Sequence, residues 1–275
     1  MTTSYQILVP EKVTIPMEFY GNTPFLWGHL DGERRLFLFD SGAQDIVLNS
    51  RYVDDEGAEK GYSGIGATGA PVTFQTKIES LSFGEWSFGA REVLAMNMQH
   101  IEEEYEVEFH GLIGFRQLIH FEWMVDYNRE YLQLVRQFNK KEHKLAGRVK
   151  TQYFSHLPSF EAVIAGEKCK LLLDTGAPEF VFDETKKDRI ASAFTFRAHE
   201  TLEGASPDKV PVEAGTLSGF EVGGLEFGPC ELKFMDMTQM KQHMGDFDGI
   251  IGYGMLSQRP AIVSWSYKAI WFLEE

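Results

Sequence analysis

Two short motifs of the sequence place an aspartate, a hydroxyl residue, a glycine and an alanine in a row: DSGA at residues 40–43 and DTGA at residues 174–177. Each motif follows an apolar run, which predicts a strand that is buried on both faces and ends at the aspartate. An ionised aspartate is seldom buried without partners, and a glycine lets the backbone turn sharply and approach a neighbour closely. The motifs therefore predict two carboxylates, Asp40 and Asp174, each held on a tight and rigid turn.

The two motifs lie at equivalent positions of an internal repeat. FLFDSGAQDIVLN at residues 37–49 resembles LLLDTGAPEFVFD at 171–183, and HGLIGFRQL at 110–118 resembles DGIIGYGML at 248–256. Both pairs keep their order and nearly the same shift, which indicates that one unit has been duplicated. A single Asp-Ser/Thr-Gly segment is usually an ordinary surface turn, but two of them at equivalent places of a repeat favour a functional site.

The repeat suggests what the two carboxylates could do together. A duplicated unit tends to pack about an approximate twofold axis, as a homodimer does, so equivalent residues nearest the axis can meet. Two carboxyl groups a few ångströms apart cannot both ionise readily, and they share one proton. The ionised group can take a proton from a water between them, and the protonated group can donate to a substrate carbonyl. This chemistry hydrolyses an amide without a covalent intermediate.

The surrounding pattern is rich in β-structure. Strands are expected where apolar residues run together or alternate with polar ones, at 32–39, 72–83, 167–173 and 216–227. Gly223 and Gly224 supply a hairpin turn within the last of these stretches. Short helices are expected at 115–118, at 253–256 and within 235–244. The four methionines of residues 235–244 fit packing or a loop lid better than a cofactor site.

At these residues the sequence resembles the aspartic peptidase clan of pepsin and retropepsin, for which a carboxylate pair that shares one proton is the known chemistry. DSGA and DTGA are similar to its catalytic signature, and the alanine after each glycine is closer to the retropepsin-like branch. The segments LIG at 112–114 and IIG at 250–252 are similar to its second signature, which buttresses the catalytic loop. All four elements occur in order and cover nearly the whole chain.

The resemblance implies a role for each of these residues. Asp40 and Asp174 would be catalytic, and the hydroxyls of Ser41 and Thr175 would interlock beneath them. Gly42 and Gly176 would bring backbone N–H groups near the carboxylates. The active-site support would comprise Ser41, Gly42, Ala43, Thr175, Gly176 and Ala177, and the buttress would comprise Leu112, Ile113, Gly114, Ile250, Ile251 and Gly252.

The resemblance also implies an all-β fold with two pseudo-symmetric β-barrel-like lobes around a cleft. The lobes would span residues 1–145 and 146–275, joined by a basic surface linker at 140–150. The implied activity is that of an aspartic-type endopeptidase, similar to bacterial aspartyl proteases with retropepsin-like halves. Its substrate would be a peptide or an unstructured protein. The expected protein is a monomer that needs no metal or organic cofactor.

A glycine-rich stretch, SGIGATG at residues 63–69, is similar to the flap of retropepsins. Glycines would let this hairpin tip open and close over a substrate. The flap residues that would contact substrate are Gly64, Ile65, Gly66 and Ala67. The equivalent stretch of the second half, residues 201–206, is poorer in glycine, so one functional flap is expected. Mostly apolar subsites are expected near Ile46, Ile65 and Phe180.

The composition and charge of the chain exclude some classes of binding partner. The chain has 275 residues and a formal net charge of −15, which argues against nucleic acid and anionic membranes because phosphate binding needs basic patches. No segment reaches the roughly 18 apolar residues that a membrane span needs. The N-terminus lacks the pattern of a signal peptide. The expected location is cytoplasmic for the full chain, or periplasmic or secreted if a signal has been removed.

Several departures and alternatives remain open at this level. The disulfide pattern of many pepsins is absent, and pairing of the two cysteines, Cys169 and Cys230, is open. The same motifs could belong to a catalytically silent peptide-binding protein. Actin-like ATPases also carry an Asp-x-Gly turn in each half of a duplication, but the helices and nucleotide motifs they need are missing. The ten-residue spacing of His100, His110 and His120 fits no zinc motif, and no G-x-S-x-G marks a serine nucleophile.

Overall fold

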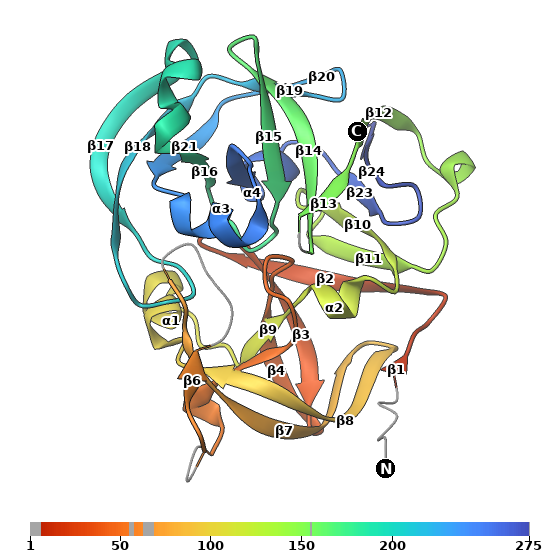
Figure 1. The fold of residues 1–275 in the computed structure, drawn as a ribbon. Coiled ribbons are helices and arrows are strands. Elements are labelled where there is room, and N and C mark those ends of the chain that lie inside the picture. The colour runs from red at the N-terminus through yellow and green to blue at the C-terminus, as the bar shows by residue number, and fades with distance from the viewer. Residues whose placement is uncertain (1–6, 55–57, 63–68, 155, 275) are drawn as a thin grey trace.

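The computed structural model describes residues 7–54, 58–62, 69–154 and 156–274, and it is mostly β (Figure 1). The described strands form two large sheets. The 14-stranded sheet contains β1 (Ile7–Leu8), β2 (Lys12–Tyr20), β3 (Thr23–Leu30), β4 (Glu33–Phe39), β5 (Val47–Asn49), β6 (Gly61–Tyr62), β7 (Val72–Phe83), β8 (Trp86–Met96), β9 (Gly111–Ile113), β10 (Glu122–Asp126), β11 (Tyr131–Val135), β12 (Leu145–Lys150), β23 (Ala261–Ser264) and β24 (Ala269–Leu273). The 10-stranded sheet contains β13 (Gln152–Phe154), β14 (Leu157–Ile164), β15 (Glu167–Leu173), β16 (Phe180–Asp183), β17 (Phe194–Leu202), β18 (Val210–Leu217), β19 (Phe220–Val222), β20 (Leu225–Phe227), β21 (Cys230–Met235) and β22 (Gly249–Ile251).

Helices are short and lie between the strands. The described α-helices are α1 (Gln99–Tyr105), α2 (Phe115–Leu118), α3 (Thr238–Met244) and α4 (Tyr253–Leu256), and the 3-10 helices are η1 (Ser50–Tyr52), η2 (Lys140–Glu142), η3 (Glu184–Arg189) and η4 (Ala191–Ala193). The expected helices at 115–118 and 253–256 are confirmed as α2 and α4. Within the described residues, no helix is long and apolar enough to cross a membrane.

Each half contains the same four-strand unit. The strand that ends at the aspartate runs parallel to the strand that carries the second signature: β4 beside β9, and β15 beside β22. The strand after the aspartate turn, β5 or β16, pairs antiparallel with β9 or β22 and parallel with β8 or β21. Even the registers match, because Leu38 lies opposite Leu112 and Leu172 lies opposite Ile250. The unit therefore puts both aspartates at the same point of their sheets.

Burial follows the sequence pattern of the strands. Residues 12–18 of β2 alternate strictly between exposed and buried, as expected for a strand with one face on the core. The inner ends of β4 and β15 are buried on both faces, as predicted, and Leu171, Leu172 and Leu173 have no exposed surface. Burial of these apolar runs anchors the strands that deliver the two aspartates.

The predicted linker is wrong in its second part. Residues 145–150 form β12, which pairs antiparallel with β24. The neighbouring β23 pairs with β10, so strands that follow the second copy of the repeat join the 14-stranded sheet. The chain thus enters the 10-stranded sheet at β13 and returns to the 14-stranded sheet at β23. The single boundary between lobes that was predicted near residue 145 stays a prediction.

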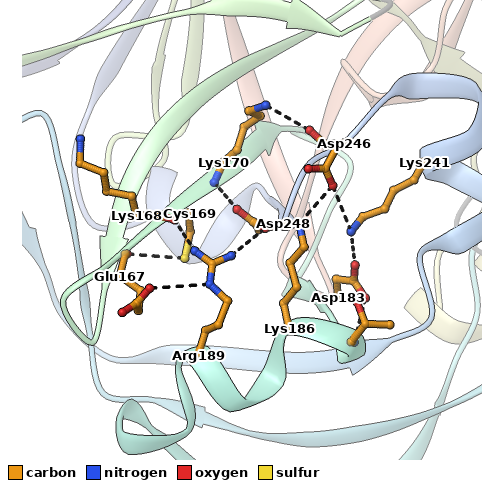
Figure 2. A network of polar contacts seen from close by, with 11 residues as sticks. Glu167, Lys168, Cys169, Lys170, Asp183, Lys186, Arg189, Lys241, Asp246 and Asp248 are labelled. Carbon is orange, nitrogen blue, oxygen red and sulfur yellow. Dashed lines mark hydrogen bonds and ion pairs between the residues drawn. The ribbon is translucent and has the colours of Figure 1, made fainter.

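A network of charges braces the outer end of the second repeat unit, and Figure 2 shows it from close by. The carboxylate of Asp248, just before β22, is buried and accepts from the backbone N–H of Lys170 at 2.6 Å. Lys186 Nζ lies 2.6 Å and Arg189 Nη1 3.2 Å from the other oxygen of the same carboxylate. These contacts tie η3 to β15 and β22, and they satisfy a charge that would otherwise be costly to bury.

Candidate active site

Asp40 and Asp174 directly follow β4 and β15, at the ends of the buried runs. The backbone N–H of Asp40 donates to Ile113 O at 3.1 Å, and that of Asp174 donates to Ile251 O at 3.1 Å. Each aspartate is therefore fixed by the strand of the second signature. Their side chains are partly exposed at the floor of one cavity.

The carboxyl groups of Asp40 and Asp174, one from each half of the chain, face each other. A Cβ added to Gly176 would lie 2.5 Å from Asp40 Oδ1, and a Cβ added to Gly42 would overlap Asp174 Oδ2. Each glycine thus brings its backbone against the carboxylate of the opposite half, a close approach that only glycine permits. The two carboxyls are also within hydrogen-bonding reach of each other. The structure brings together the pair that the sequence singled out.

Backbone donors hold both carboxylates in place. Asp40 Oδ1 accepts from Gly42 N at 2.8 Å and from Ala43 N at 3.1 Å, and Asp174 Oδ1 accepts from Gly176 N at 2.9 Å. Burial and the neighbouring charge of Asp174 nevertheless raise the pKa of Asp40 to about 8. Burial also raises the pKa of Asp174, against the lowering effect of its hydrogen bonds. The pair therefore retains at least one proton at neutral pH.

The hydroxyl residues beneath the aspartates interlock across the two halves. Ser41 N donates to Thr175 Oγ1 at 2.8 Å, and Thr175 N donates to Ser41 Oγ at 3.0 Å. Thr175 Oγ1 in turn donates to the carbonyl of Phe39 at 2.9 Å. Both hydroxyl residues are buried, so this reciprocal exchange fixes the two aspartate turns relative to one another.

Thr175→Val is expected to lower the free energy of unfolding by about 2–3 kcal/mol, because it leaves the buried Ser41 N–H and Phe39 carbonyl without their partner. Thr175→Ser keeps the hydroxyl and serves as the matched control. Urea denaturation of both variants measures the difference. Equal stability of the valine and serine variants would show that the Thr175 hydroxyl adds nothing to the free energy of unfolding.

The second signature buttresses both turns. The N–H of Phe115, at the start of α2, donates to Ala43 O at 2.8 Å, and that of Tyr253, at the start of α4, donates to Ala177 O at 3.1 Å. A Cβ at Gly114 would lie 2.5 Å from Asp45 O, and one at Gly252 would overlap the carbonyl of Asp174. Glycine is therefore required at both positions for the helices to approach the loops. The apolar signature residues Leu112 and Ile250 line the cavity itself.

The cavity over the carboxylates has a volume of about 880 Å³ and is walled by both halves of the chain. Ile46 lines it, as expected. Near Phe180 the apolar lining comes from its neighbour Val181, whereas the Phe180 side chain itself is fully buried in the core. Successive strand residues point to opposite faces, and in the apolar run of β16 the sequence does not tell which face is which.

The predicted flap residues Gly64, Ile65, Gly66 and Ala67 lie outside the described residues, as does the subsite residue Ile65. The adjoining strand β7 contributes Thr73 and Gln75 to the cavity lining. In the second half, β17 and β18 form a long hairpin, and residues 201–205 at its tip also line the cavity. This tip contacts α1, where His100 Nε2 lies 2.8 Å from Gly204 O.

Several residues at the cavity had no signal in the sequence motifs. His156 Nε2 lies 2.6 Å from the carbonyl oxygen of Gly42, in the turn that carries Asp40. Lys233 is mostly buried at the cavity wall, with its Nζ 2.5 Å from Glu179 and 3.5 Å from Glu200. A methionine-rich wall from α3 and the end of β21 also borders the cavity. Of these features, only the methionine-rich wall could have been found from the sequence, because its Met-x-Met pattern recurs in the first half.

The three histidines and two cysteines noted in the sequence do not line the cavity. His100 contacts Gly204, and His110 stacks on Tyr52 with ring centroids 4.2 Å apart. His120 is exposed in the turn after α2. Cys169 and Cys230 are free thiols, and burial raises the pKa of the Cys169 thiol to about 11 and that of Cys230 to about 12. Among the residues that the structure describes, no group of His, Cys, Asp and Glu is arranged to hold a metal ion.

Paired carboxyl groups that share a proton beside an open cavity can perform general acid–base chemistry on a bound carbonyl. The sequence matches no protein-family model and no curated protein.

Proposed function

We propose that this protein is an aspartic-type endopeptidase of the pepsin and retropepsin clan, with two retropepsin-like halves that form pseudo-symmetric lobes around the cleft. The observation that carries the proposal is the crossed approach of the aspartate turns, in which Gly176 abuts the carboxyl of Asp40 and Gly42 abuts that of Asp174. Together with the interlocked hydroxyls of Ser41 and Thr175, this arrangement supports one site built equally by both halves.

The proposed reaction uses a water molecule held between the two carboxyl groups. Asp174, ionised, takes a proton from this water, whose oxygen attacks the peptide carbonyl carbon. Asp40, protonated, donates its proton to the carbonyl oxygen, giving a tetrahedral diol. Collapse of the diol breaks the C–N bond and transfers a proton to the leaving nitrogen, so the products are a carboxylate and an amine. The step uses only these two side chains and water.

The raised pKa of Asp40 supports this division of roles. A carboxyl whose pKa lies near 8 remains protonated at neutral pH and can act as the acid, while its partner acts as the base. Aspartic proteases are the known example of two carboxyl groups with such divided roles. The sequence resemblance and the raised pKa of Asp40 therefore support the same type of chemistry. The cavity of about 880 Å³, with apolar walls from both halves, suits an extended peptide segment with its side chains in apolar subsites.

A peptide-library digest tests the proposal. The wild-type protein is expected to release new termini from unstructured peptides, and the Asp40→Asn variant is expected to release none. A peptide mimic with a hydroxyl in place of the attacked carbonyl should inhibit the wild type. Identical product profiles for both proteins would remove the peptidase proposal, and tight peptide binding without cleavage would favour the silent peptide-binding alternative.

A further inference from the structure

The internal repeat extends through the segment that precedes the second signature in each half. Residues 95–105 align with residues 234–244, so that the Met-x-Met of Met96 and Met98 matches that of Met235 and Met237. The structure places the two segments alike: β8 ends at Met96 and is followed by α1, and β21 ends at Met235 and is followed by α3. In this alignment Ile101 of α1 corresponds to Met240 of α3.

Both segments line the cavity that holds the two carboxyl groups. Met96, Ile101 and Tyr105 border it from the first half, and we call them the first-half wall. Met235, Met240 and Met244 are their equivalents in the second half, and we call them the second-half wall. The first-half wall packs with Leu38 and Leu112, and the second-half wall packs with Val181 and Ile250. The cavity therefore has two matched sides that differ in chemistry.

The first-half wall is rigid at Ile101 and Tyr105, the two positions at which it differs from the second-half wall. The hydroxyls of Tyr105 and Thr23 are hydrogen-bonded at 3.1 Å, and Thr23 is fully buried. The ring of Tyr105 packs edge-on against Phe25, with centroids 6.2 Å apart, and a Cβ at Gly21 would come within 2.6 Å of it. Ile101 is β-branched and has little freedom at χ1. This side of the cavity cannot change shape without losing a buried hydrogen bond and close ring contacts.

The second-half wall is adaptable. Methionine is unbranched, has three rotatable bonds and a polarisable sulfur, and can therefore fit partners of different shape. Met240 is buried against the apolar cluster of Met235 and Ile250, and Met244 packs at its margin. Two methionines stand where the first-half wall has an isoleucine and a tyrosine. The surface of the second-half wall can therefore repack around a bound side chain.

We propose that the two sides of the cleft differ in selectivity: the second-half wall accepts a broad range of long or bulky apolar side chains, and the first-half wall accepts a narrow set fixed by shape. The substrates of this protein would be peptides in which the apolar residue on one side of the cleaved bond varies freely, whereas the residue on the other side does not. The inference rests on the proposed function, because it assigns the two walls to the residues flanking the cleaved bond.

The repeat supplies the test, since each wall can be rebuilt with the residues of the other. The variant Met240→Ile/Met244→Tyr gives the second half the first-half residues, and Ile101→Met/Tyr105→Met is the reciprocal variant. The measurement is kcat/KM for peptides with Val, Leu, Met, Phe or Tyr on either side of the cleaved bond. In the wild type we expect values to differ by less than about 5-fold at one position and by about 10- to 100-fold at the other.

The Met240→Ile/Met244→Tyr variant is expected to widen the small spread to about 10-fold or more and to leave the other position unchanged. The reciprocal variant should reduce the large spread. Equal spreads in the wild type, or spreads that neither variant alters, would overturn the inference. Thermal melting of both variants shows whether they are folded, and either one suffices for the test.

A binding measurement separates this inference from the proposed function. The same peptides with a reduced, uncleavable bond are titrated into the wild type and both variants by calorimetry. If no peptide is cleaved but binding shows one broad and one narrow position that the variants alter, the peptidase proposal fails and the wall assignment stands. If peptides are cleaved but binding and cleavage show two equal positions, the wall assignment fails and the peptidase proposal stands.

Discussion

Asp174→Asn is expected to lower kcat/KM for an unstructured peptide by about 10³- to 10⁴-fold, because the amide cannot take a proton from the attacking water. The substitution conserves shape, and the asparagine Oδ1 can still accept from Gly176 N, as the carboxylate does at 2.9 Å. The variant should therefore fold normally. Cleavage of a quenched fluorescent peptide measures the loss, and circular dichroism checks the fold.

Asp45→Asn is the matched control for this prediction. Asp45 lines the same cavity but bonds to Arg116 and Gln117 instead of the opposite carboxyl. Its substitution is expected to change kcat/KM by less than about tenfold. An Asp174→Asn variant that retains activity, or a control that loses as much, would contradict the assignment of Asp174 as the base.

Asp40→Asn is expected to be more stable than the wild type at alkaline pH, by about 2–4 kcal/mol at pH 9. Burial and the charge of Asp174 raise the pKa of Asp40 from 3.8 to about 8. The folded protein therefore binds a proton that the unfolded chain has released. This carboxyl costs stability progressively as pH rises above about 4, and the cost is complete above about 8. An amide does not ionise and escapes this cost.

Urea denaturation between pH 5 and pH 9 measures this difference. The free energy of unfolding of the wild type should fall relative to the variant across this range. Asp188→Asn, which alters an exposed aspartate on η3, is the control and should follow the wild type at every pH. A constant difference between wild type and Asp40→Asn would mean that Asp40 is ionised in the same range in both the folded and unfolded states.

The local features of the site were predictable because they depend on neighbouring residues. A buried apolar run before each Asp-x-Gly-Ala motif required a strand and a turn, and β4 and β15 end where expected. The hairpin at Gly223 and Gly224 joins β19 and β20, and both glycines have the positive φ that such a turn needs. The repeat then implied that the two turns could meet, and their glycines do abut the opposite carboxyls.

Features that depend on long-range pairing were not predictable in this way. Residues 145–150 are polar enough to suggest a linker, but they form β12 because β24 offers them backbone partners. An apolar lining was expected near Phe180, but the sequence did not reveal that Val181 supplies it while Phe180 lies in the core, since an apolar strand has no polar side to show its orientation. His156 bonds to Gly42 across more than a hundred residues, and no motif marks it.

NMR of the protein labelled at the aspartate carboxyl carbons tests whether Asp40 and Asp174 share one proton. The Asp40→Asn variant identifies the Asp40 signal. We predict that this signal titrates with a midpoint near pH 8, and that the Asp174 signal shifts in the variant. Two signals that titrate independently near pH 4 would contradict the shared proton and, with it, the proposed chemistry.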